Sequence, residues 1–194
     1  CYNMNISDLS GVESFTDLTN LTCSNNQLTS IDLSYNTALT SLNCGNNQLT
    51  SIDVSGATAL SFLRVSENQL TILDVSTNTD LTYLYCIYNQ LINLDVRNGN
   101  NTNFNIFYST FNSDLICIFV DDADWSATNW TNIDPTSTFV NDEAECDTLS
   151  LGDNSLVLEV NIYPNPTDDY LFIEGNKNPI SISIYNLLGA EVIS

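Results

Sequence analysis

Apolar and polar positions repeat along most of the chain with a period of 21 residues. The unit LTNLTCSNNQLTSIDLSYNTA, from Leu18 to Ala38, recurs so that the chain holds four similar copies. Within each copy apolar residues alternate twice with polar ones, as at Leu21 and Cys23 and again at Ile31 and Leu33. A period of two is typical of a strand with one buried face. The pattern therefore predicts a coil of stacked turns, mainly β, with strands on both faces and little helix.

Aligned copies place leucine in three columns, which we expect to form buried rungs. Asparagine occupies a further position in every copy, and we expect its amide to satisfy backbone groups inside the coil. The asparagine column is Asn26, Asn47, Asn68 and Asn89. The leucine columns are Leu18, Leu39, Leu60 and Leu81; Leu21, Leu42, Leu63 and Leu84; and Leu28, Leu49, Leu70 and Leu91.

Both ends of the array depart from the repeat. Residues 1–17 keep the apolar phase but have Phe15 where an asparagine is expected, which predicts an N-terminal cap. The coil itself is assigned to residues 18–114, as four regular turns and a degenerate fifth. In the fifth turn the places of Leu81, Leu84 and Asn89 are taken by Phe104, Phe107 and Asn112.

Residues 115–146 no longer follow the repeat. We expect them to form a C-terminal cap that closes the core with Trp125, Trp130 and Phe139. An acidic linker follows at residues 147–159.

The spelling LxxLxCxxNxL of each copy resembles the leucine-rich repeat. The whole unit resembles the short repeats of secreted bacterial surface proteins, with the internalins as distant relatives, over residues 6–146. This resemblance implies a right-handed solenoid of parallel strands in which the face of the first strand is concave.

From residue 160 the sequence changes to VNIYPNPTDDYLFIEGNKNPISISIYNLLGAEVIS, which resembles the C-terminal sorting domain of type IX secretion substrates. The motif residues are Tyr163, Pro164, Asn165 and Pro166. Members of that family continue for some tens of residues, so we expect residues 160–194 to be a truncated copy that forms a partial, β-sandwich-like module. The resemblance implies contact with the type IX machinery and a place outside a Gram-negative cell, secreted or on its outer surface.

Charge and composition exclude several classes of function. The chain carries 24 acidic residues against three basic ones, a net charge of -21, and would repel nucleic acid. We expect no membrane span, and CYNMNISDLS at the start lacks the features of a signal peptide, as in a processed protein or a fragment. Histidine is absent, which removes the usual general base and zinc ligand. We expect no enzyme, although a carboxylate pair in a deep pocket would reopen that class.

Three of the cysteines share one inward column, where Val65 takes the remaining place. Buried free thiols are the interpretation we favour, because neighbouring side chains in such a column run parallel and suit a disulfide poorly. Cys117 and Cys146 bracket the C-terminal cap. They either form a disulfide or remain free thiols, and the sequence does not decide between the two. The column consists of Cys23, Cys44 and Cys86.

Outward positions of the first strand change in one direction along the coil, from polar in the first two turns to aromatic in the later ones. An aromatic patch edged by an arginine is common to protein hot spots and to platforms on which sugars stack. We expect it to bind a protein or a carbohydrate, unless the C-terminal cap folds over the rings. The candidate residues are Phe62, Arg64, Tyr83, Tyr85, Tyr88, Tyr108 and Phe111.

An acidic column lies on the second strand. Its carboxylates, about 4.8 Å apart, repel one another unless something compensates them. Calcium is a weak candidate, and hydrogen bonds to nearby hydroxyl groups are the favoured alternative. The column is Asp32, Asp53, Asp74 and Asp95. No other cofactor is expected.

Two functions remain. The first is a secreted or cell-surface, non-catalytic module that binds a protein or glycan through its concave face. The second is a structural spacer without a dedicated ligand, stabilised or not by calcium.

Overall fold

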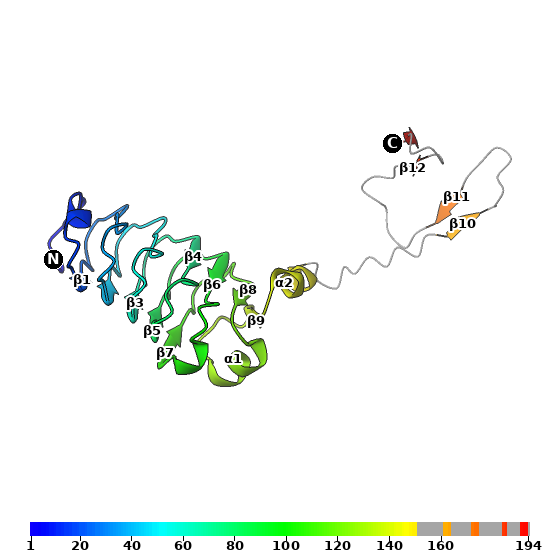
Figure 1. Cartoon of the computed structure of the whole chain (residues 1–194). Coiled ribbons are helices and arrows are strands. Elements are labelled where there is room, and N and C mark those ends of the chain that lie inside the picture. The colour runs from blue at the N-terminus through cyan, green and yellow to red at the C-terminus, as the bar shows by residue number, and fades with distance from the viewer. Residues whose placement is uncertain (151–160, 164–171, 175–183, 186–190, 194) are drawn as a thin grey trace. The chain divides into compact units, whose positions relative to one another are not determined.

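A computed structural model describes residues 1–150 and, further on, 161–163, 172–174, 184–185 and 191–193 (Figure 1). The chain divides into two units, Cys1–Ser150 and Leu151–Ser194. The first unit is a β-solenoid of about six turns with few helices, which confirms the leucine-rich repeat fold inferred from the repeat.

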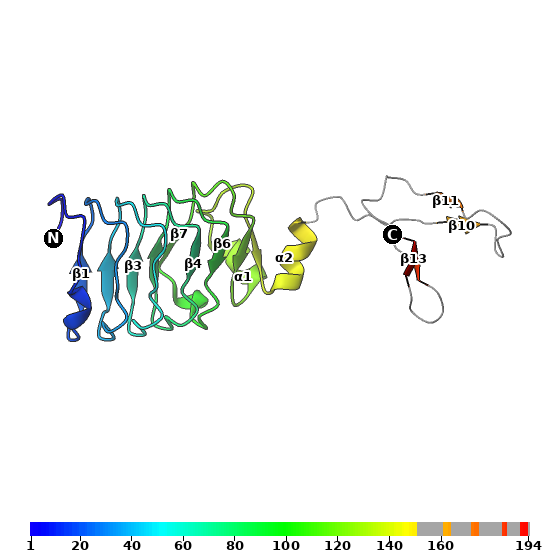
Figure 2. The ribbon, with the colours of Figure 1, turned by 90° about the horizontal axis from the view of Figure 1, so that it is seen from above.

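Five parallel strands from successive turns form the first sheet, with each turn in register with the next (Figure 2). The middle residue of each strand points inward, so Leu63 pairs with Leu42 on one side and Leu84 on the other. Phe107 pairs with Leu84, as the alignment of the degenerate turn predicted. The strands are β1 (Asn20–Thr22), β2 (Ser41–Asn43), β3 (Phe62–Arg64), β5 (Tyr83–Tyr85) and β7 (Ile106–Tyr108).

A second parallel sheet lies on the other side of the core. The two-faced strand pattern is confirmed, but the second sheet starts only at the third turn. Residues 115–140, which we assigned to the cap, contribute two strands that continue this sheet. Its strands are β4 (Ile72–Asp74), β6 (Asn93–Asp95), β8 (Cys117–Phe119) and β9 (Thr138–Val140).

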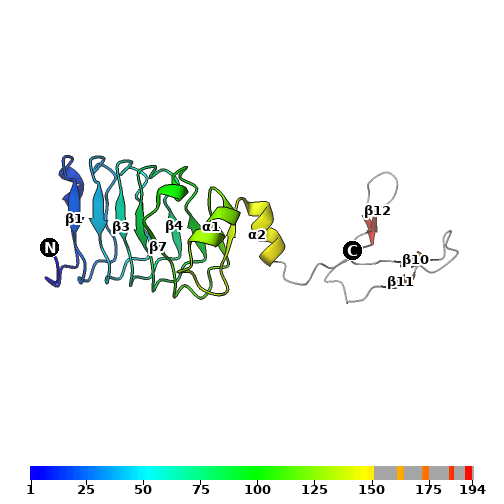
Figure 3. The same cartoon turned by 90° about the horizontal axis from the view of Figure 1, so that it is seen from below.

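Helical elements of the first unit are short. Of two 3₁₀ turns, η1 (Val12–Ser14) lies in the N-terminal cap and η2 (Asn101–Asn103) lies in the coil before β7. Two α-helices, α1 (Ala123–Asn129) and α2 (Glu143–Ser150), come after its last regular turn (Figure 3). Asp122 caps α1, because its carboxylate accepts a hydrogen bond from the backbone N–H of Trp125 at 2.9 Å.

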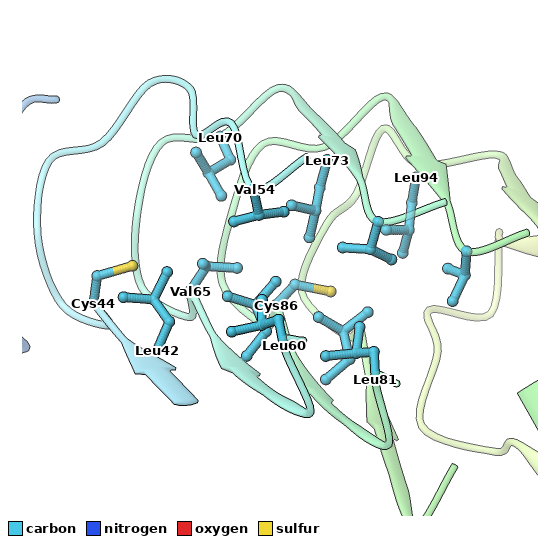
Figure 4. Packing of buried hydrophobic residues seen from close by; sticks show 14 of the residues in the cluster. Leu42, Cys44, Val54, Leu60, Val65, Leu70, Leu73, Leu81, Cys86 and Leu94 are labelled. Atoms are coloured by element: carbon cyan, nitrogen blue, oxygen red, sulfur yellow. The ribbon is translucent and has the colours of Figure 1, made fainter. Parts of the chain in front are cut away.

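The leucine columns form the core. From the second turn onward their side chains are fully buried, and Figure 4 shows Leu60 and Leu81 packed beside Val65 and Cys86. Leu18 and Leu21 in the first turn, at the N-terminal end of the core, are only half-buried. Each fully buried leucine stabilises the coil by roughly 1.5–3 kcal/mol.

The cysteine column is buried in the core of the coil. Cys23, Cys44 and Cys86 carry free thiols and have no exposed surface. The thiols of Cys44 and Cys86 point to backbone carbonyls of the following turn, those of Arg64 at 3.8 Å and Tyr108 at 3.4 Å. The buried-thiol interpretation agrees with this geometry.

The C-terminal end of the core is closed by aromatic rings. Trp130 stacks on Phe107 with 4.2 Å between ring centroids, and Phe139 meets Trp130 at 5.7 Å. Both closing rings are buried, while Trp125 is half-buried. Cys117 and Cys146, for which pairing was left open, form a disulfide that ties α2 to β8.

Short antiparallel strand pairs are the described part of the second unit. β10 (Asn161–Tyr163) pairs with β11 (Phe172–Glu174), and β12 (Ile184–Tyr185) pairs with β13 (Glu191–Ile193). β11 lies in the YLFIEG segment of the sequence that resembles a sorting domain.

Candidate functional site

The outer face of the first sheet carries an aromatic surface, defined as Phe62, Arg64, Tyr83, Tyr85, Tyr88, Tyr108 and Phe111. Strand alternation explains its position. In β5, Leu84 is buried, so Tyr83 and Tyr85 on either side of it face outward. The structure therefore brings all seven candidate residues onto one face, from three neighbouring turns.

Rings of adjacent turns contact one another along the sheet. Phe62 lies 6.0 Å from Tyr83 and 5.7 Å from Tyr85, measured between ring centroids. Tyr85 meets Tyr108 edge-to-face at 5.5 Å, and the guanidinium carbon of Arg64 is 6.0 Å from the Tyr85 ring. Such contacts hold the rings in place before any ligand arrives.

Tyr88 and Phe111 extend this surface into the turns after β5 and β7. Their rings stack in parallel with 4.1 Å between centroids. Both residues have left-handed backbone, with φ of 55° and 63°. The equivalent positions in the earlier turns, which are also left-handed, are Asn25, Asn46 and Glu67.

Left-handed backbone is unfavourable for bulky residues, roughly 1–2 kcal/mol for L-amino acids in general, and asparagine tolerates it best. The first two turns follow this preference with Asn25 and Asn46. The fourth and fifth turns place large rings there instead, and both rings are half exposed, Tyr88 at 50% and Phe111 at 56%. Stacking of the two rings offsets part of this strain.

The C-terminal cap does not bury the aromatic surface. Tyr108, the ring nearest the cap in sequence, is 36% exposed, and Tyr83 and Tyr85 keep part of their surface in solvent. The cap packs instead on the inner ring of the same strand, where Trp130 covers Phe107.

The outward columns of the first sheet are almost free of charge, although Asp134 of the cap accepts hydrogen bonds from the N–H groups of Phe111 and Asn112 at their edge. Three outward columns from five turns contain one cation, Arg64, and one anion, Glu67, although the chain has 24 acidic residues. The remaining outward residues are Asn20, Thr22, Asn25, Ser41, Asn43, Asn46, Phe62, Tyr83, Tyr85, Tyr88, Ile106, Tyr108 and Phe111.

The acidic column runs through the second half of each turn, where Asp74 and Asp95 belong to the second sheet, and its carboxylates bind local backbone. The side chains of Asp32, Asp53 and Asp74 each accept a hydrogen bond from the N–H two residues later, at 2.8–2.9 Å. Hydrogen bonds from Ser34 hold the pKa of Asp32 below its usual value. These aspartates thus form turns of the kind that follow a strand.

Asp95, the last of the column, accepts the same hydrogen bond from the N–H of Arg97 at 3.0 Å and is also paired with a cation. Arg97 follows it where the other turns have serine, and its guanidinium bridges Asp95 at 2.6 Å and Glu143 of α2 at 2.9 Å. The Arg97 guanidinium also lies 4.8 Å from the ring of Phe119. Within the described residues, no three acidic or cysteine side chains converge as metal ligands.

Of the sorting motif, Tyr163 is the last residue of β10. Pro164, Asn165 and Pro166 lie outside the described residues.

A second asparagine ladder was not predicted, although its position had been noted where Phe15 replaces the asparagine in the N-terminal cap. Asn36 and Asn78 are fully buried and donate from their amides to backbone carbonyls of the preceding turn. Their spacing of two periods was a usable signal, hidden because Ala57 occupies the turn between them. The left-handed column and the bridge made by Arg97 were missed as well.

Comparison with known proteins agrees with this architecture. A family of Leucine Rich repeats (2 copies) matches residues 16–57, and a Secretion system C-terminal sorting domain matches residues 161–194. No curated protein matches the chain. None of the helices in the described residues is long and apolar enough to cross a membrane.

Among solved structures, the chain is similar to the functional domain of InlJ from Listeria monocytogenes, described as including a cysteine ladder. The sequences are 37% identical, the TM-score is 0.54, and the match covers 62% of this chain. The chain spans only 29% of the length of that protein.

Proposed function

Because the chain is a secreted or cell-surface leucine-rich repeat protein with a C-terminal sorting domain, we propose that its solenoid is a non-catalytic module that binds a protein or glycan through the aromatic surface. The observation that carries this proposal is the set of contacting, solvent-accessible rings on three neighbouring turns.

Two features distinguish this surface from ordinary exposed side chains. Contiguous exposed aromatic patches on soluble proteins commonly mark interaction sites. In addition, Tyr88 and Phe111 occupy backbone that disfavours them, and such strain is typical of functional positions. The sorting domain supports delivery outside the cell through the type IX machinery, and we propose the outer surface of a Gram-negative bacterium as the site of action.

The buried thiols have a structural role in this proposal. Cys23, Cys44 and Cys86 form a column of the kind that the name of the InlJ domain describes as a cysteine ladder. We assign them to packing between turns and not to ligand binding.

The test is a binding screen of the full chain on a glycan array and on immobilised extracellular proteins. A Tyr85→Ala, Tyr108→Ala double variant should bind any ligand so found at least about tenfold more weakly, since hot-spot rings contribute more than about 1 kcal/mol each. Tyr35→Ala is the matched control, because Tyr35 is 66% exposed but lies outside the aromatic surface.

If the dissociation constant is unchanged in the double variant, the aromatic surface is not the binding site. If the chain binds none of the glycans or proteins, the spacer function is supported instead.

A further inference from the structure

A pocket of about 400 Å³ lies at the C-terminal end of the first sheet, between β7 and α1. Ile106 and Tyr108 line it from β7, and Trp125 and Asn129 line it from α1, which lies beside β7 in Figures 1 and 3. Tyr108 also belongs to the aromatic surface, so the pocket continues that surface at its closed end.

The lining combines aromatic rings with neutral polar groups. None of the eleven described residues around the pocket carries a charge, on a chain whose net charge is -21. Three asparagines and two threonines provide amide and hydroxyl groups: Asn105, Asn129, Asn132, Thr102 and Thr131.

Several of these polar groups are free for a ligand. The side chains of Asn105, Asn132 and Thr131 are exposed, and within the described residues the hydrogen bonds of Asn105 and Asn132 are made by their backbone groups. Each amide offers both donors and an acceptor, which is the combination that a ring of hydroxyl groups requires.

We propose that this pocket binds one unit of an uncharged polysaccharide, and that further units lie along the aromatic surface. A pyranose has apolar C–H faces, which suit Tyr108 and Trp125, and a rim of hydroxyl groups, which suits the amides. The turns repeat every 4.8 Å or so, close to the length of one sugar in an extended chain. The placement of the further units rests on the proposed function, because Tyr108 is shared.

The charges of the chain favour a neutral polysaccharide over an anionic polysaccharide or a basic protein. An anionic polysaccharide would be repelled by the acidic chain. A basic protein would be attracted by acidic groups, yet the outward columns of the first sheet contain only Glu67 and the pocket none. A face with so few charged residues, on so acidic a protein, fits a neutral partner.

Affinity electrophoresis of the full chain tests the proposal, with gels that contain a β-1,4-glucan, a β-1,3-glucan, an α-mannan or a β-1,4-galactan, and polygalacturonate as the anionic comparison. At least one neutral polysaccharide should retard the protein, and polygalacturonate should not. An Asn105→Ala, Asn132→Ala variant should bind about tenfold more weakly, as expected for the loss of several hydrogen bonds. Gln48→Ala, Gln69→Ala is the matched control, since both amides are exposed and far from the pocket in sequence.

The two proposals fail differently. If no neutral polysaccharide retards the protein, the inference is wrong, and a protein ligand that requires Tyr85 still supports the proposed function. If Tyr85→Ala weakens the retardation and the pocket variant leaves it unchanged, the inference is also wrong. The aromatic surface is then still supported as the binding site. Retardation that only the pocket variant weakens supports the pocket and contradicts the proposed function. Asn132→Asp, which keeps the size of the side chain, should reproduce the loss and guards against misfolding of the double variant.

Discussion

The side chain of Asn68 on one turn of the solenoid accepts a hydrogen bond from the backbone N–H of Leu49 on the preceding turn, at 3.0 Å. Its amide nitrogen also donates to the carbonyls of Cys44 and Val65, at 3.1 and 2.9 Å. Asn47 and Asn89 repeat these contacts one turn before and after. One side chain therefore satisfies buried backbone groups of two turns at once.

Replacing Asn68 by alanine should lower the free energy of unfolding by at least about 2 kcal/mol, because buried donors and acceptors lose their partners at roughly 1–3 kcal/mol each. Urea titration followed by circular dichroism measures the change. Gln69→Ala, an exposed neighbour, should change stability by less than about 0.5 kcal/mol. Equal stability of the two variants would contradict a structural role for the asparagine column.

A carboxylate introduced at Leu63 should unfold the solenoid, whereas one at Ile72 should be tolerated. Leu63 is fully buried in the first sheet, and Ile72, in the same turn, is 56% exposed on the second. Loss of a buried leucine removes about 1.5–3 kcal/mol before the buried charge is counted. Leu63→Asp and Ile72→Asp are compared by circular dichroism. A folded Leu63→Asp protein would show that the column does not point inward.

Ser109 offers a stabilising change. It stands one turn after Cys86 in the cysteine column and is fully buried, and its hydroxyl has no hydrogen-bond partner among the described residues. Ser109→Ala should raise the free energy of unfolding by about 1 kcal/mol, because the unfavourable burial of the hydroxyl is removed. The exposed Ser113→Ala is the control in the same thermal scans. A lower melting temperature for Ser109→Ala would mean that the hydroxyl has a partner in solution.

Stability should fall at alkaline pH in part because of one buried thiol. Burial raises the pKa of Cys86 from its ordinary value of 9.0 to about 12. Below pH 9 the thiol is protonated in both states, and between pH 9 and 12 only the unfolded chain ionises, so stability is lost with rising pH. The loss approaches about 4 kcal/mol at the upper limit, from 1.36 kcal/mol per pKa unit.

Cys86→Val isolates this contribution, because valine already occupies the same column at Val65. Chemical unfolding at pH 8 and pH 10 should show a smaller pH dependence in the variant than in the wild type. Identical slopes would mean that Cys86 ionises equally in both states.

Reduction should destabilise the C-terminal end. The bond between Cys117 and Cys146 closes a segment with a sequence separation of 29, and bridges of this kind stabilise by about 2–4 kcal/mol. A phosphine reductant should therefore lower the melting temperature of the wild type in calorimetry. The Cys117→Ala, Cys146→Ala variant should start at the lower temperature and not respond to reductant. If the reductant also lowers the melting temperature of that variant, the destabilisation comes from other cysteines.

Regular parts of the fold followed from periodicity. The inward leucines, the asparagine column and the position of Phe107 were predictable because each turn repeats the environment of the one before, so that a residue's place in the period fixes its surroundings. The same periodicity placed the seven residues of the aromatic surface on one face. Their role in binding remains a proposal.

Two features that do repeat from turn to turn were still not obtained from the sequence pattern. The hydrogen bonds of Asp32 and its equivalents run to backbone N–H groups two residues on, which a charge pattern does not reveal. The left-handed backbone at Tyr88 and Phe111 was hidden for a similar reason, since aromatic residues do not indicate positive φ.

By itself the sequence determined the stacking of turns, the inward columns and the nearly neutral composition of one face, because these depend on spacing along the chain. Only the tertiary structure decided that the cap leaves Tyr108 in solvent, that Cys117 meets Cys146 and that α1 forms a pocket against β7. Each of these brings together segments beyond the last regular turn. There the path of the chain is set by which side chains pack on the end of the core, above all Trp130 on Phe107, and no period encodes that contact.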